Sequence, residues 1–86
     1  MKSFVYTIRD PLGIHARPAG LLAKIAKGFE GTAITVGKDG NAVPAERLIR
    51  LMGLGVGQGD SVTVAADGMR EEEAIDAMER FFRENL

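Results

Sequence analysis

The chain has 86 residues, of which 45% are hydrophobic and 27% are charged, and its formal net charge at pH 7 is −1. With no cysteine and one histidine, it offers neither a disulfide framework nor the ligands of a usual structural zinc site. Its scattered charges argue against a nucleic-acid partner, and the absence of a long apolar run argues against membrane insertion and a signal peptide.

The first third of the chain predicts a strand, a turn and a helix. Apolar and polar residues alternate over residues 3–8, which indicates a half-buried strand. Proline and glycine interrupt the pattern at residues 10–13. Apolar residues then recur with a helical period over residues 17–27, where Pro18 fits the first turn and Gly28 ends the helix.

The rest of the chain predicts three strands and two helices. Strands are expected over residues 32–36, 41–43 and 60–66, with Asp39-Gly40 as the hairpin turn between the first two. The intervening segments are a short helix at 45–53, a glycine-rich loop at 53–59, a turn at 67–68 and a final helix at 70–84.

The element order is therefore β-α-β-β-α-β-α. Most of the strands have one apolar face and the helices have one apolar stripe, so helices on one face of an antiparallel sheet would bury both. We expect one domain over residues 1–86 with an α+β fold. It would be an open-faced β-sandwich in which three helices cover one face of a four-stranded antiparallel sheet.

The only histidine, His15, lies in the run GIHARPAG at residues 13–20. It comes just before the first predicted helix, whose unpaired N–H groups, those of Ala16 and Arg17, favour anions. Neutral imidazole is a nucleophile, guanidinium binds phosphate through two donors, and Pro18 stiffens the turn. These features suit a histidine that receives a phosphoryl group, and the residues alone fit other anion-related roles as well.

The run GIHARPAG resembles the active-site motif of the HPr family, the histidine-containing phosphocarriers of the bacterial sugar phosphotransferase system. The resemblance extends over essentially the whole chain. Family-like positions hold Ala26-Lys27-Gly28-Phe29, Gly40, Leu54-Gly55-Val56, Gln58-Gly59 and the glutamates that open the last helix.

The resemblance implies that His15 accepts a phosphoryl group at Nδ1 from phosphorylated enzyme I, which is charged from phosphoenolpyruvate. The group would then pass to an enzyme IIA domain for sugar uptake. Arg17 would stabilise the phosphoryl group, together with the N–H groups of Ala16 and Arg17. The protein would be a cytoplasmic, monomeric carrier without cofactor or metal, and not a stand-alone enzyme.

The helix at residues 45–53 is too short to bury all of its apolar side chains, so an exposed apolar patch is expected. In the HPr family this helix and the first helix form the face that docks on enzyme I and enzyme IIA. The resemblance implies that the docking face on this sequence would comprise Gly20, Leu48, Ile49, Met52 and Leu54. Nearby basic residues could steer an acidic partner, namely Lys24, Lys27, Arg47 and Arg50.

One position departs from the family pattern. Many members carry a regulatory serine at the start of the short helix, which a dedicated kinase phosphorylates. Arg47 holds that position here, and the only serines are Ser3 and Ser61. Since arginine cannot accept a phosphoryl ester and has the opposite charge, the resemblance does not extend to serine-linked regulation.

Three other functions remain open. A carrier for a regulatory, nitrogen-type phosphotransferase branch would keep His15 and Arg17, whereas a module that only binds a regulator would need neither. A small nucleic-acid binder has poor support because the chain is slightly acidic and lacks an aromatic platform. The adjacent glutamates at 71–73 point in different directions on a helix, so they match its positive end and not a metal site.

Overall fold

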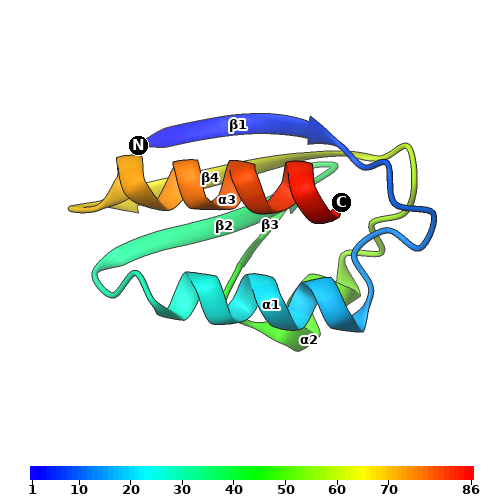
Figure 1. Cartoon of the computed structure of the whole chain (residues 1–86), viewed down its shortest axis with the longest axis horizontal. Coiled ribbons are helices and arrows are strands. Elements are labelled where there is room, and N and C mark those ends of the chain that lie inside the picture. Colours follow the sequence, from blue (N-terminus) through cyan, green and yellow to red (C-terminus); the bar gives the residue numbers. More distant parts are fainter.

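The computed structural model describes all 86 residues and has the element order β-α-β-β-α-β-α (Figure 1). The elements are β1 (Lys2–Thr7), α1 (Ala16–Lys27), β2 (Thr32–Lys38), β3 (Asn41–Pro44), α2 (Leu48–Gly53), β4 (Ser61–Gly68) and α3 (Glu71–Asn85). The predicted fold class is confirmed: the protein is an α+β open-faced sandwich with a four-stranded antiparallel sheet and three helices.

The strands pair in the order β1-β4-β2-β3, so the long strand β4 lies inside the sheet. On β4, Val64 pairs with Phe4 on one side and with Val36 on the other, and Val64 and Val36 are fully buried. The alternation seen in the sequence therefore turns one face of each strand to the core. The β2–β3 hairpin turns at Asp39 and Gly40, whose φ angles of 52° and 83° are those of the favoured two-residue hairpin turn.

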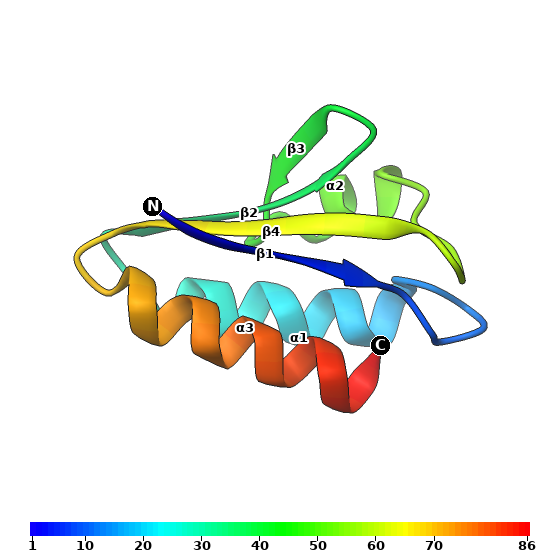
Figure 2. The same cartoon turned by 90° about the horizontal axis from the view of Figure 1, so that it is seen from above.

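Helices α1 and α3 lie side by side and cover the same face of the sheet (Figure 2). The buried ring of Phe82 on α3 meets the rings of Phe4 and Tyr6 edge to face, at centroid distances of 5.8 and 5.6 Å. Helix α2 packs against α1 and β3. Burial of a side chain such as Phe82 or Leu22 contributes about 1.5–3 kcal/mol to the stability of the fold. None of the three helices has the length and apolar composition needed to cross a bilayer.

The short helix begins three residues later than its sequence predicts. Ala45 is buried, and its N–H donates to the Ile34 oxygen at 2.8 Å. The Arg47 N–H closes a turn on the Pro44 oxygen at 3.1 Å, and α2 starts only after it. The prediction of a helix over 45–53 is therefore wrong for residues 45–47, because a hydrogen bond to a strand distant in sequence overrides local helix propensity.

The turn predicted at Asp67-Gly68 is also misplaced. These residues pair with Ala33 and Thr32, so β4 extends two residues further than expected. At Gly68, φ is 149° and a Cβ would lie 2.7 Å from the Thr32 Cα, so the backbones approach too closely for a side chain. The chain turns instead at residues 69–70, and α3 follows at once.

Candidate functional site

His15 is the residue that caps the start of α1. Its backbone is extended (φ −93°, ψ −176°), its oxygen accepts the Ala19 N–H at 3.0 Å, and its side chain makes no capping hydrogen bond. The N–H groups of Ala16 and Arg17 donate to no acceptor in the protein, and Pro18 has no N–H. The imidazole therefore lies beside two unpaired donors at the positive end of a helix and does not occupy them.

His15 and Arg17 line the same shallow hollow. The remaining lining residues are Asp10, Pro18, Leu21 and Asn85, and the volume is about 80 Å³. The His15 side chain is 36% exposed, and the exposed Arg17 has no hydrogen bond or ion pair within the protein. A hollow of this size accommodates a phosphoryl group, whereas sites for small molecules usually measure about 300–1,000 Å³.

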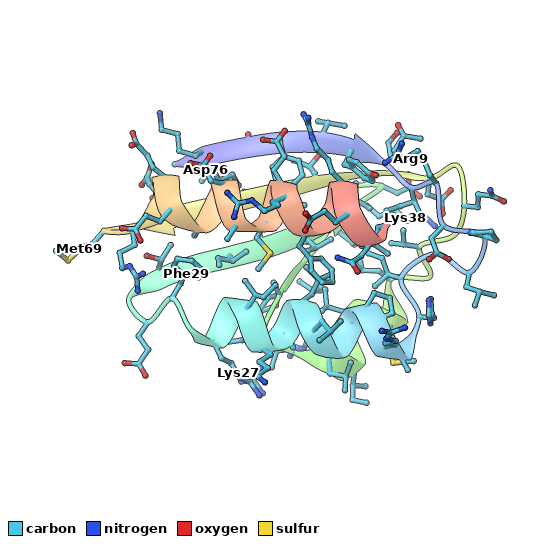
Figure 3. The ribbon with its side chains drawn as sticks, in the orientation of Figure 1. Arg9, Lys27, Phe29, Lys38, Met69 and Asp76 are labelled. Carbon is cyan, nitrogen blue, oxygen red and sulfur yellow. The ribbon has the colours of Figure 1, made fainter.

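A larger hollow lies elsewhere on the molecule. It measures about 460 Å³ and is formed around the C-terminal end of α1 and the start of β2, where Lys27 and Phe29 lie (Figure 3). It contains none of the residues predicted for the phosphoryl site or the docking face, and no histidine. The smaller hollow differs in that it joins an imidazole to free donors and a free cation.

The loop before His15 rests directly on the glycine-rich loop that precedes β4. The Ile14 N–H donates to the Val56 oxygen at 3.1 Å, and Gly13 has a positive φ of 65°. A Cβ on Gly13 would overlap the Val56 oxygen and lie 2.7 Å from the Gly57 Cα. The position of the imidazole therefore depends on close contact between two loops that are far apart in sequence.

Lys38 and Asp60 fasten the second of these loops to the sheet. The Lys38 Nζ lies 2.9 Å from the Asp60 Oδ2 and donates to the Gly55 oxygen at 2.8 Å. The Gly57 N–H also donates to the Asp60 Oδ2 at 2.8 Å. The hydrogen bond from Gly57, followed by the contact with Lys38, lowers the pKa of Asp60 from its ordinary value of 3.8.

This lowered pKa predicts an acid dependence of stability. A carboxyl group whose pKa is lower in the folded state stabilises the fold above its unfolded pKa, and this contribution is lost as the pH falls through the folded value. We expect Asp60→Asn to lower the free energy of unfolding near pH 7, and the difference from the unsubstituted protein to vanish at a pH well below 3.8, once the carboxyl group is protonated in the folded state. Urea unfolding at both pH values measures this, and a difference that persists in acid would contradict the ionic origin.

The predicted docking residues differ in how far they are exposed. Leu48, Ile49 and Met52 are all exposed, and Ile49 is the most open at 79%. Leu54 is half-buried and packs against the core, and half-buried Gly20 has open space around it. The basic residues predicted beside them are all exposed and form no ion pair with the protein, namely Lys24, Lys27, Arg47 and Arg50.

Three residues of the hollow are not among the predicted ones, namely Asp10, Leu21 and Asn85. Asn85 is the last residue of α3, and its side chain donates to the Phe81 oxygen. Leu21 is 41% exposed and lies outside the apolar stripe of α1, so its exposure on an otherwise polar helix face was the available signal. Asp10 lies in the segment 10–13 that the sequence marks only as a turn, but its Oδ2 lies 3.9 Å from the His15 Nε2. Its side chain forms a turn by accepting the Leu12 N–H, which gives no indication of the second contact.

The chain is similar to known proteins in sequence and in structure. A family model described as "PTS HPr component phosphorylation site" matches residues 2–84. The chain is 41% identical over 85 residues to phosphocarrier protein HPr of Mycoplasma genitalium, which covers 99% of this chain and 97% of that protein. The crystal structure of an HPr from Thermoanaerobacter tengcongensis is similar at a TM-score of 0.90 and 40% identity, over 96% of this chain and 92% of that one. The solution structure of Crh, the Bacillus subtilis catabolite repression HPr, is similar at a TM-score of 0.70 and 32% sequence identity. The match covers 99% of this chain and 100% of that one.

Proposed function

Because this chain belongs to the HPr family of phosphocarriers of the phosphotransferase system, we propose that His15 accepts a phosphoryl group from phosphorylated enzyme I and passes it to enzyme IIA domains. The observation that carries the proposal is the exposed imidazole beside two free N–H groups and the unpaired Arg17. A phosphocarrier of this kind is not a stand-alone catalyst. It would act as a monomer in the cytoplasm.

The transfer step exchanges one nitrogen–phosphorus bond for another. The lone pair of the His15 Nδ1 forms the new bond while the bond to the donor histidine of enzyme I breaks, and the donor ring keeps the electron pair. The N–H groups of Ala16 and Arg17 and the Arg17 guanidinium bind the phosphoryl oxygens. In the second transfer the same bond breaks as a nitrogen of enzyme IIA attacks. The partner supplies the alignment that a hollow of about 80 Å³ cannot provide alone.

The proposal is tested by incubating the protein with enzyme I and phosphoenolpyruvate. We expect the intact mass to rise by one phosphoryl group, and the modification to be labile in acid and stable in base. An unchanged mass, with an enzyme I that phosphorylates another carrier in the same assay, would contradict the proposal.

The exposed side chains of Leu48, Ile49 and Met52 supply the proposed docking face for both partners. They lie on α2, which packs beside α1, so a partner seated there also reaches the start of α1 (Figure 1). Exposed apolar groups of this kind gain free energy when a partner covers them. The unpaired basic residues around them would speed encounter with an acidic partner.

We expect Met52→Glu to slow transfer from enzyme I by about 10- to 30-fold, because a carboxylate would be buried without a partner in the complex. The matched control is Met69→Glu, since Met69 is 98% exposed and lies at the tip of the β4–α3 turn, away from α1 and α2 (Figure 3). Phosphorylation rates of the two variants measure the effect. Equal rates would place the docking face elsewhere.

Arg47 caps α2 without a side-chain hydrogen bond and is exposed, so the position of the family's regulatory serine offers no hydroxyl to a kinase. We propose that this chain is not regulated by phosphorylation at that position. The positive charge there remains available for a partner of opposite charge.

A regulatory role is the second candidate. The likeness to a Bacillus subtilis protein named for catabolite repression, and an apolar face that does not need His15, favour it. The test offers the phosphorylated protein to enzyme IIA domains of a sugar branch and of a nitrogen-type branch. The domain that accepts the phosphoryl group faster shows which of the two branches the carrier serves. A module that only binds a regulator would transfer to neither.

A further inference from the structure

The carboxylate of Asp10 faces the side of the His15 ring that the proposed chemistry does not use. Its Oδ2 lies 3.9 Å from the His15 Nε2, and both residues line the hollow described above. No other carboxylate lies within ion-pair distance of His15. Asp10 is outside the run GIHARPAG, so the motif does not include it.

Three hydrogen bonds hold Asp10 in this place. Its Oδ1 accepts the Leu12 N–H at 2.8 Å, which leaves Oδ2 directed to the imidazole. Its backbone N–H donates to the Leu86 oxygen at 2.9 Å, and its own oxygen accepts the Gly13 N–H at 3.0 Å. The side chain is only 25% exposed. Asp10 is therefore a fixed carboxylate, with one oxygen used in the turn and the other facing the histidine.

We propose that Asp10 is a positioning residue for phosphoryl transfer, which keeps the imidazole proton of His15 on Nε2 so that Nδ1 presents its lone pair. This inference rests on the proposed function of His15. A neutral imidazole has one N–H and one acceptor nitrogen, and a nearby carboxylate favours the form in which the N–H faces it. Apo sites often hold such groups slightly too far apart for a hydrogen bond, and the contact tightens in the complex.

The proton on Nε2 serves both halves of the transfer cycle. When the bond between Nδ1 and phosphorus forms, the ring becomes an imidazolium that carries its proton on Nε2, and the Asp10 carboxylate compensates that positive charge. When the bond breaks, the ring leaves as the neutral imidazole with the same proton on Nε2. No proton has to move in either step, and Arg17 and the helix N–H groups remain available for the phosphoryl oxygens.

The test is Asp10→Asn. An asparagine keeps the size of the side chain and can still accept the Leu12 N–H through its oxygen, which turns its NH₂ group to the ring. That donor favours an unprotonated Nε2 and places the proton on Nδ1, where it blocks the attack. We expect ¹⁵N NMR of the neutral ring to show a shift from the Nε2–H to the Nδ1–H form, and phosphorylation by enzyme I to slow about tenfold.

Two further variants separate this role from others. Asp76→Asn makes the same charge change on the exposed surface of α3 (Figure 3) and should alter neither the NMR signature nor the rate. Asp10→Ala removes both the turn contact and the carboxylate. If Asp10→Asn keeps the tautomer and the rate of the unsubstituted protein while Asp10→Ala changes the rate, Asp10 only shapes the turn and the proposal is overturned.

The NMR measurement does not depend on phosphoryl transfer. If the unsubstituted protein is not phosphorylated at all, the proposed function fails, and the tautomer of the ring still decides whether Asp10 positions it. If the protein is phosphorylated but its neutral ring carries the proton on Nδ1, the proposed function stands and the inference about Asp10 falls.

Discussion

Replacement of His15 by alanine is expected to reduce phosphorylation by enzyme I and phosphoenolpyruvate to background. No other imidazole exists in the chain, so no second residue of the same type can take over the nitrogen–phosphorus bond. Arg17 and the N–H groups of α1 would still bind an anion, but they have no nucleophilic lone pair to offer. Mass spectrometry of the intact protein after incubation measures the loss.

The fold of this variant should remain intact. The His15 side chain is partly exposed and makes no capping hydrogen bond, so its removal should change the free energy of unfolding by less than about 0.5 kcal/mol. Urea unfolding provides this control. Acid-labile phosphate on a folded His15→Ala variant would have to lie on another type of side chain, and the assignment of His15 as acceptor would be wrong.

Replacement of Gly13 by alanine is expected to destabilise the protein by about 3 kcal/mol, a large part of the stability of a domain of this size. An alanine at positive φ costs about 1–2 kcal/mol. The new Cβ would also overlap the Val56 oxygen, which forces the two loops apart and costs about 1–3 kcal/mol more. Phosphorylation of the remaining folded fraction should slow, because the Ile14 hydrogen bond that places His15 is disturbed.

Gly31→Ala is the matched control for this substitution. Gly31 has a φ of 82°, but a Cβ there would meet nothing within 4 Å. It should therefore show only the conformational cost of about 1–2 kcal/mol and no change in phosphorylation rate. Urea unfolding of both variants gives the comparison, and equal losses of stability would show that the loop contact contributes nothing.

Much of this fold follows from patterns that are local in sequence. The alternation around Phe4 and Val64 predicts which faces of β1 and β4 are buried, and Asp39-Gly40 predicts the hairpin between β2 and β3. The crowding of Leu48, Ile49 and Met52 on a short helix predicts that part of this apolar surface stays open. The motif around His15 likewise indicates the chemistry of the site.

Sequence patterns do not predict the structure where contacts between residues distant along the chain determine it. Residues 45–47 have an acceptable helical composition, yet the Ala45 N–H pairs with Ile34 on a neighbouring strand. Lys38 and Asp60 meet because β2 and β4, which are distant in sequence, pair side by side in the sheet. The direction of the Asp10 carboxylate depends on the Leu86 oxygen that holds its backbone. No periodicity or motif contains these contacts.

The hollow around His15 is too small to shield a phosphoryl group in the phosphorylated form of the protein. Nothing in the chain folds over that ring, so a bound phosphoryl group would be open to hydrolysis until another protein covers it. The fraction of molecules in the loaded form would then reflect the balance between the proteins that deliver the group and those that remove it. The phosphorylated fraction of such a carrier would therefore change with the rates at which phosphoryl groups are delivered and removed.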